Sequence, residues 1–313
     1  MARMDDLAPL RVLANEHPAT SLAGEGDAHF TRLVADRTRK RLAIEPRPDA
    51  ALGYTSLQQV AAVERGEIAM ADSFGGALGE DHRALGLSTL PFVAADPRQA
   101  RALYLAARRA YTEAFQHRNQ VLLYATPWPP SGLWTRAPLR SVHEAAALTV
   151  RTYDAVSCSL FAKLGAHARV VSFAELPPRL ASGEIDAALS SGDGGAARVL
   201  RASLAHFTEI DYAIPLSFTT VNLDFWLWLG EGLRRTVEEA ARETESLQWH
   251  ALDGRIAINR ARLRAQGVTV HPPGALREAL REAAREAVAA WCAEAGPELA
   301  AILEAAPRAS APR

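Results

Sequence analysis

A proline-rich loop bearing a tryptophan and a lone arginine at a strand end are the residues of this chain best suited to binding chemistry. Trp128 begins the run Trp-Pro-Pro-Ser-Gly over 128–132, and Arg151 follows 19 residues after Gly132. Prolines fix φ and remove backbone N–H donors, so the indole would be held in place at little entropic cost. A guanidinium is a planar fork that meets a carboxylate with two parallel hydrogen bonds. The pair therefore predicts a site for a small carboxylate.

Both residues also have ordinary structural interpretations. Trp128 could be a core residue that covers a strand end, and Arg151 could be a solvated or structural arginine. The position of Arg151 favours binding, because Leu148-Thr149-Val150 predicts a buried strand and Arg151 stands at its C-terminal end. Open α/β sheets bind ligands in the crevice beyond such strand ends.

Ser190 stands at the tip of a second predicted strand, over 184–189. It could supply a hydroxyl to the same crevice, or it could cap the helix that starts near Gly192. The run Gly192-Asp193-Gly194-Gly195 could offer backbone N–H groups to an anion, but its glycine spacing fits no nucleotide motif. We expect a turn or a helix N-terminus near a smaller ligand there.

Catalytic and metal-binding motifs are missing from the sequence. It holds no G-x-S-x-G elbow, no phosphate loop, no H-E-x-x-H and no G-x-G-x-x-G after the first strand. The nine histidines never pair at i+3 or i+4, which predicts surface or capping roles. Cys158 lies near Arg151 in sequence but has no placed base, and with Cys292 it is predicted to be a separate, small, buried thiol. We therefore expect no enzyme, no bound metal and no cofactor.

Composition narrows the partners further. The 313 residues are 49% hydrophobic and 23% charged, with a formal net charge of −1, which predicts a packed protein without the basic surface that nucleic acids require. No apolar run reaches the length needed to span a bilayer. The first nine residues lack the layout of a secretory leader, so an exported form would have lost its leader from this sequence.

Short apolar runs alternate with amphipathic stretches through the first two thirds of the chain. This alternation is typical of βαβ units, and it predicts an α/β protein with a mainly parallel sheet and long helices over 231–265 and 275–304. The earlier helices are expected over 27–40, 55–65, 97–116 and 174–182, and the strands over 10–14, 42–45, 67–72, 120–125, 147–150, 169–172 and 184–189.

Taken in order, several of these stretches resemble the DctP-type solute-binding proteins of the tripartite ATP-independent periplasmic (TRAP) transporters, and within that family the subgroup with a Trp-Pro-Pro loop. The resemblance runs from about Leu10 to Trp291. It is carried by Glu25–Phe30, Leu52-Gly53, Val63–Ile68, Leu90–Phe92, Pro127–Gly132, Val150–Tyr153, Ala174–Leu176 and Leu180–Asp186.

The resemblance implies a two-lobed periplasmic-binding-protein fold with two crossing strands and a long helix that spans the hinge. The crossings would lie near Leu123–Thr126 and Asp211–Ser217. Lobe I would comprise 1–124 and 213–252, and lobe II 125–212 and 253–306, with a tail over 307–313.

The implied function is a periplasmic, non-enzymatic receptor that delivers a small 2-oxo, 2-hydroxy or aromatic monocarboxylate to TRAP membrane permease subunits. A sensory or regulatory ligand-binding subunit of the same fold is the alternative. The family's arginine anchor falls on Arg151, and the polar partner falls on Ser190, beside Ser191. The remaining residues expected at the ligand are Trp128, Phe74 and Tyr153.

Two positions depart from the family pattern. Glu144-Ala145-Ala146-Ala147 stands where an Asp-x-x-Gly turn usually precedes the arginine strand, and the polar partner is a serine rather than a larger amide. The second arginine that the family uses for large acidic sugars is replaced around Ser131-Gly132, which argues against a ligand resembling sialic acid. The sequence thus leaves the identity of the acid open, along with the oligomeric state and the involvement of a cation.

Overall fold

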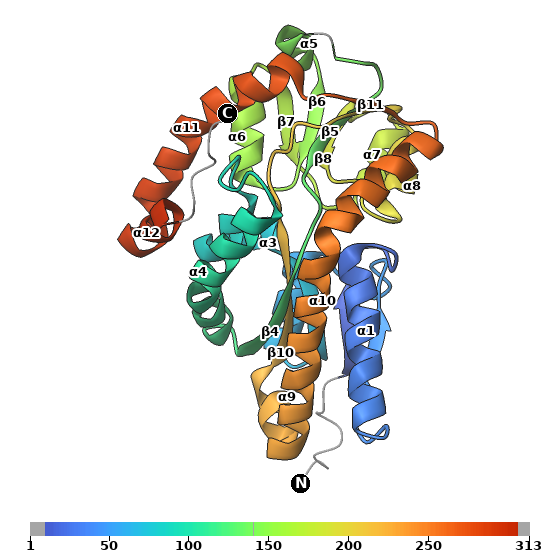
Figure 1. Cartoon of the computed structure of the whole chain (residues 1–313), viewed down its shortest axis with the longest axis vertical. Coiled ribbons are helices and arrows are strands. Elements are labelled where there is room, and N and C mark those ends of the chain that lie inside the picture. The colour runs from blue at the N-terminus through green and yellow to red at the C-terminus, as the bar shows by residue number, and fades with distance from the viewer. Residues whose placement is uncertain (1–9, 140, 306–313) are drawn as a thin grey trace.

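A computed structural model describes residues 10–139 and 141–305 of the chain (Figure 1). The tail predicted over 307–313 and the first nine residues of predicted lobe I lie outside the described residues. The strands are β1 (Leu10–Asn15), β2 (Glu45–Arg47), β3 (Ile68–Phe74), β4 (Gln120–Pro127), β5 (Gly132–Thr135), β6 (Thr149–Thr152), β7 (His167–Val170), β8 (Ala187–Ser190), β9 (His206–Thr208), β10 (Leu216–Asn222) and β11 (Thr269–His271).

Helices and strands alternate through the first two thirds of the chain, as predicted. The helices are α1 (Leu22–Arg37), α2 (Ser56–Glu64), α3 (Gly75–Leu78), the 3₁₀ helix η2 (Arg83–Thr89), α4 (Pro97–Gln116), α5 (Val142–Ala146), α6 (Ala155–Lys163), α7 (Leu176–Ala181), α8 (Ala196–Arg201), α9 (Leu223–Trp228), α10 (Gly230–Ala265), α11 (Gly274–Ala295) and α12 (Pro297–Ala305).

The first sheet has the order β2-β1-β3-β10-β4. Its central strands β3 and β10 are buried almost throughout, because helices cover both faces of the sheet, and they are accordingly rich in apolar and β-branched residues. The second sheet has the order β11-β9-β5-β8-β6-β7, and in it β6 runs parallel to both β7 and β8.

The prediction of a mainly parallel sheet is wrong for one strand in each sheet. Strand β10 is antiparallel to β3 and β4, and β5 is antiparallel to β8 and β9. The cause is the path of the chain: β4 leads out of the first sheet into β5 of the second, and β10 returns after β9. A strand that returns from the other sheet enters in the opposite direction to its neighbours.

The helix α10 spans the molecule, and the predicted two-lobed fold with a hinge-spanning helix is confirmed. Near its start, Val237 packs in a core cluster with first-sheet residues, and near its end Leu263 packs in a cluster with second-sheet residues. Figure 1 shows the helix running beside β4 and β10 from one half to the other. The exact boundaries between lobe I and lobe II, predicted after residues 124, 212 and 252, stay a prediction.

The C-terminal helix predicted over 275–304 is broken in two. Gly296 has a φ of 88°, and Pro297 follows it at the start of α12. A left-handed glycine followed by a residue without an N–H ends one helix and allows another to begin at a new angle. Cys158 and Cys292 are separate free thiols as predicted, but both are partly exposed rather than buried.

Candidate functional site

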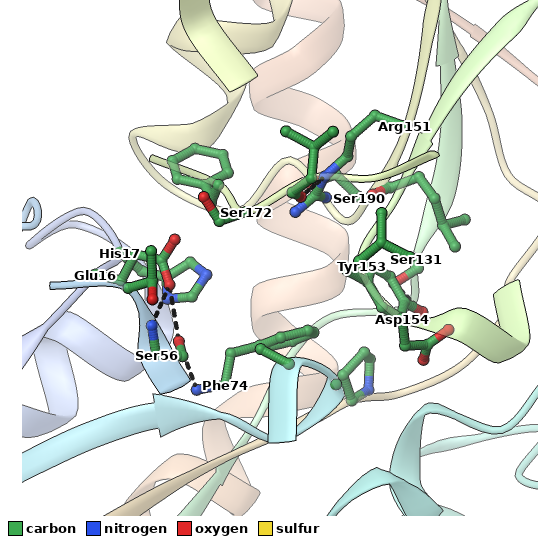
Figure 2. A pocket seen from close by; sticks show the side chains of 18 of the residues that line it. Glu16, His17, Ser56, Phe74, Ser131, Arg151, Tyr153, Asp154, Ser172 and Ser190 are labelled. Atoms are coloured by element: carbon green, nitrogen blue, oxygen red, sulfur yellow. Dashed lines mark hydrogen bonds between the residues drawn. The ribbon is translucent and has the colours of Figure 1, made fainter. Parts of the chain in front are cut away.

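A cavity of about 540 Å³ lies where the carboxyl ends of strands from both sheets meet. Residues that end or closely follow β1, β3, β6 and β8 line it, and they come from both halves of the molecule (Figure 2). The volume is in the range of sites that enclose small organic molecules. Strand-end geometry of this kind is where α/β proteins place their ligands.

All six residues predicted at the ligand line this one cavity. Sequence positions up to 117 residues apart are thus brought together, which the spacing alone could not show. Their role in binding stays a prediction. The six are Phe74, Trp128, Arg151, Tyr153, Ser190 and Ser191.

The guanidinium of Arg151 is held by backbone carbonyl groups of the neighbouring strand β8 and of the segment that follows β7. Nε donates to the carbonyl oxygen of Val171 at 2.8 Å, and Nη1 donates to that of Leu189 at 3.0 Å. These bonds fix the plane of the group and use two of its five N–H donors. The remaining donors form no hydrogen bond with a described residue, and Figure 2 shows the guanidinium group at the cavity.

The charge of Arg151 has no carboxylate partner among the described residues, and its aromatic contact is with Tyr153, whose ring centroid lies 6.0 Å from the guanidinium carbon. The residue is 5% exposed, yet among the described residues it forms no ion pair with a carboxylate. Burial lowers the pKa of Arg151 to about 10, with the carboxylates of Glu16 and Asp154 acting in the opposite direction, so it is still cationic at neutral pH. An unpaired buried charge costs several kcal/mol, roughly, and an anion in the cavity would offset that cost.

Two hydrogen bonds to the start of β10 and the residue just before it fix Trp128. Its indole N–H donates to Ser217 Oγ at 2.9 Å, and its backbone N–H donates to the carbonyl oxygen of Pro215 at 2.8 Å. Gly132 ends the loop because a Cβ there would come within 2.3 Å of the Phe207 ring. The loop is thus stiff for two reasons: its prolines restrict the backbone, and Trp128 is hydrogen-bonded to the start of β10 and the residue just before it.

Aromatic rings form one wall of the cavity. Phe74 meets Tyr153 edge to face with ring centroids 5.3 Å apart, and it meets Trp128 in a similar way at 6.2 Å. Tyr153 lies two residues after Arg151 and its hydroxyl is 3.5 Å from Ser131 Oγ. Such a wall suits the apolar body of an organic acid.

Ser190 lines the cavity and also shapes the turn after β8. Its Oγ accepts a hydrogen bond from the Gly192 N–H at 3.2 Å, while its O–H remains a donor. The interpretation of Ser190 as a helix cap is wrong, because α8 begins only at Ala196, after an N-cap at Gly195 that has no side-chain hydrogen bond. The loop that follows contacts the first lobe: Asp193 Oδ2 accepts from the N–H of Leu22 at 2.6 Å. Asp193 therefore binds α1, and the glycine run presents no phosphate loop.

Sequence reasoning missed Glu16, which lies directly after β1. Its Oε2 accepts from both the N–H and the hydroxyl of Ser56, at 2.7 and 2.9 Å, and its Oε1 accepts from the N–H of Ala174 at 3.1 Å. The carboxylate therefore joins the start of α2 to the segment after β7 across the cavity. Its position at a strand end is the signal that singled out Arg151, and it could have been found in the same way.

His17, beside it, was also missed, and its predicted surface or capping role is wrong, because the side chain is buried. The imidazole lies within aromatic contact distance of Trp128, Phe173 and Phe74, at centroid distances of 4.8, 5.6 and 5.7 Å. Burial lowers the pKa of His17 below its ordinary value, with Arg151 acting in the same direction and Glu16 against it. The ring is therefore neutral at pH 7.

Elsewhere, His206 and His271 approach each other on neighbouring strands, with Nδ1 and Nε2 3.0 Å apart. Over residues 10–139 and 141–305, no group of three or more side chains could hold a metal ion. Within the same range, no helix is long and apolar enough to cross a membrane.

Solved structures share this fold over nearly the whole chain. DctP7 of Bordetella pertussis, an extracytoplasmic solute receptor binding pyroglutamic acid, is 23% identical with a TM-score of 0.88, covering 94% of this chain and 98% of that one. A marine metagenome TRAP solute-binding protein specific for pyroglutamate is 24% identical with the same score, over 94% and 96%. A TRAP protein of Desulfovibrio salexigens with bound orotic acid is 19% identical, with a TM-score of 0.84 over 94% and 96%.

The family assignment comes from the sequence itself. No curated protein matches the chain significantly. The profile of the DctP family, described as bacterial extracellular solute-binding protein, family 7, matches residues 13–295. That span includes both sheets apart from the first three residues of β1, the hinge-spanning helix and every described residue that lines the cavity. This chain belongs to the DctP family of bacterial extracellular solute-binding proteins.

Proposed function

We propose that this chain is the extracytoplasmic receptor of a TRAP transporter and that it captures a small organic acid in the cavity for delivery to a membrane permease. The observation that carries the proposal is the buried, unpaired guanidinium of Arg151. A protein gains nothing in stability from such a group unless an anion completes it. A carboxylate fits the fork with two charge-assisted hydrogen bonds.

The arginine cannot account for useful affinity alone. One charged hydrogen-bonded contact contributes about 1.5–3 kcal/mol, whereas micromolar binding needs about 8 kcal/mol. Burial of the ligand against Trp128, Phe74 and Tyr153 would supply much of the rest as the lobes close. Ser190 and Ser191 would complete the polar shell.

The ligand class is a monocarboxylate with a compact body, of the 2-oxo, 2-hydroxy or aromatic kind. Pyroglutamate and orotate, bound by the structurally similar receptors, are small ring-shaped acids with one carboxylate. They agree with a site that offers one cationic fork and an aromatic wall. Pyroglutamate is therefore the first acid to test.

Calorimetry or a thermal-shift screen against pyroglutamate, orotate and simple 2-oxo and aromatic acids tests the proposal. At least one acid should bind with micromolar or better affinity, and Arg151→Ala should weaken it by roughly 10- to 100-fold.

Arg169→Ala is the matched control. Arg169 is the register partner of Arg151 on β7, but it is exposed and paired with Glu184, so its loss should leave affinity unchanged. Arg151→Ala binding as tightly as the parent chain, or no acid binding at all, would refute the proposal.

A further inference from the structure

The position of His17 relative to Arg151 is the starting point. Arg151 belongs to β6 of the second sheet, whereas His17 follows β1 of the first sheet. Figure 2 shows the two side chains on facing sides of the cavity. A ligand anchored by its carboxylate at Arg151 therefore extends toward His17.

The surroundings of the imidazole fix its orientation. Three aromatic rings, those of Trp128, Phe173 and Phe74, pack around it. Its own backbone N–H donates to Asn15 Oδ1 at 2.8 Å, which ties the residue to the end of β1. A side chain held in this way presents the same atom to every ligand, as a preorganised site requires.

The two ring nitrogens have different environments. Nδ1 is enclosed by the protein and has no hydrogen-bond partner within 10–139 and 141–305. Nε2 is not enclosed in this way and forms no hydrogen bond with a described residue, so it is the nitrogen that faces the cavity.

This difference sets the tautomer. A neutral imidazole carries one N–H and one acceptor nitrogen. A proton on Nδ1 would bury an N–H donor without a partner, which folded proteins avoid. The proton therefore belongs on Nε2, and His17 offers a ligand a neutral hydrogen-bond donor.

Charges around the cavity limit what this donor can meet. Of the described residues that line it, only Arg151 is cationic, while the lining carboxyl groups belong to Glu16, Glu80, Asp154 and Glu175. A second carboxylate on the ligand would have no cation opposite it and acidic groups nearby. The acceptor at His17 should thus be uncharged.

We infer that His17 is a specificity-determining residue whose Nε2–H donates to a carbonyl oxygen of the bound acid, so that the receptor selects monocarboxylates that carry a second, neutral acceptor. The inference rests on the proposed function and deepens it. Arg151 makes the site a carboxylate site, and His17 distinguishes among carboxylates. A ring lactam, a ketone or another carbonyl group meets the requirement.

Three probes of one shape separate the two residues: pyroglutamate, its ketone analogue with CH₂ in place of the ring N–H, and cyclopentanecarboxylate, which lacks the carbonyl group. By calorimetry, the parent chain should bind the first two about tenfold more tightly than the third, the size expected for one hydrogen bond. His17→Phe should remove this preference, so that the three probes bind with similar affinity. His17→Gln, whose amide can place an N–H near the position of Nε2, should retain most of it.

The outcomes distinguish this inference from the proposed function. If the parent binds acids but does not favour the two carbonyl-bearing probes, or if His17→Phe keeps the preference, the role of His17 is refuted and the receptor function stands. If His17→Phe weakens all three probes equally, His17 contacts the carboxylate and the inference is again wrong. If the parent binds no acid in the screen, the proposed function fails, and this inference fails with it.

Circular dichroism on each variant establishes that it is folded. Should His17→Phe not fold, the comparison of His17→Gln with His17→Ala over the same probes decides the question, because only the former keeps a donor. Ring ¹⁵N chemical shifts of His17 in the parent chain give an independent check: an Nδ1–H tautomer with pyroglutamate bound would overturn the inference.

Discussion

Two arginines of this chain are almost equally buried and have opposite surroundings. Arg151 is 5% exposed and Arg255 is 8% exposed. Arg255, on α10, donates from Nε to Asp193 Oδ1 at 2.6 Å and from Nη1 to the carboxylate of Glu25 at about 3.1 Å. Arg151 has carbonyl groups to orient it and, in the part of the chain that the structure describes, no carboxylate to neutralise it.

The difference separates a structural charge from a binding charge. Arg255 and Asp193 form a closed ion pair, and Asp193 also accepts from the N–H of Leu22, so the pair ties α10, α1 and the loop after β8 together. Arg151 leaves its free donors at a cavity. Burial alone does not distinguish the two roles. The atoms that each guanidinium contacts do distinguish them.

Arg255→Ala should have the largest effect on stability. Removal of one member of a buried ion pair leaves the other charge without a partner, at a cost of about 3–5 kcal/mol. Urea unfolding of the ligand-free chain measures the loss. The double variant with Asp193→Ala should lose less than the sum of the two single changes, because the two residues interact directly.

Arg242→Ala provides the control, since Arg242 is exposed on the same helix. Its unfolding free energy should stay within about 0.5 kcal/mol of the parent. Additive losses in the Arg255 and Asp193 cycle would contradict the assignment of Arg255 as a paired structural charge.

Asp72 offers a third kind of buried charge, partly partnered and remote from solvent. Its Oδ2 accepts from Thr219 Oγ1 at 3.0 Å, while Oδ1 has no hydrogen-bond partner among the described residues. Nearby, Asp27 accepts from Asn15 at 2.7 Å and from the hydroxyl of Tyr124 at 3.0 Å. Burial raises the pKa of Asp72 from 3.8 to about 6, and burial together with Asp72 raises the pKa of Asp27 well above its ordinary value.

A carboxyl group with a raised pKa binds its proton more tightly in the folded chain than in the unfolded one. The contribution of Asp72 to the free energy of unfolding is therefore most favourable below about pH 4, and it is lost as the pH rises through about 6. Asp72→Asn has no proton to lose, so its stability relative to the parent should increase between pH 4 and pH 7, by on the order of 2–3 kcal/mol.

Unfolding in urea at several pH values measures this trend. Asp36→Asn is the control, because Asp36 is exposed on α1. A difference between Asp72→Asn and the parent that stays constant with pH would show that Asp72 does not titrate as a buried acid.

Much of the fold could be predicted because its signals are local. Helix α10 was predicted within one residue at its start, since its amphipathic pattern is long and uninterrupted. The strands β5, β9 and β11, each three or four residues long, were not predicted. Antiparallel insertion of β10 between β3 and β4 was also missed, because pairing between distant strands leaves no local pattern.

The candidate site shows the same division. Arg151 and Ser190 could be placed from their positions at strand ends. His17 and Glu16 stand at the end of β1 and carry the same signal, but neither belongs to a run that the family resemblance marked. The unpaired state of Arg151 depends on where carboxylates far along the chain are placed, which only the three-dimensional structure shows.

Replacement of Arg151 by Met tests whether Arg151, unlike Arg255, contributes little to stability. The ligand-free chain should keep its unfolding free energy within about 1 kcal/mol, because the change removes a buried unpaired charge and keeps much of the apolar stem. Binding of pyroglutamate should be lost at the same time. A loss of stability as large as that of Arg255→Ala would show that Arg151 is structural too.

The smallest effect is expected at Ser190, where a structural and a binding role coincide. Removing its Oγ leaves the Gly192 N–H without its acceptor at a partly exposed turn, which should cost about 0.5–1 kcal/mol of stability. If the O–H also donates to the ligand, Ser190→Ala should weaken acid binding by a further factor of roughly three to ten. Calorimetry with cyclopentanecarboxylate and pyroglutamate should show equal losses for both, since Ser190 lies near Arg151 at the carboxylate end. If Ser190→Ala reduces stability but leaves the affinity unchanged, Ser190 stabilises the turn after β8 and does not contact the ligand.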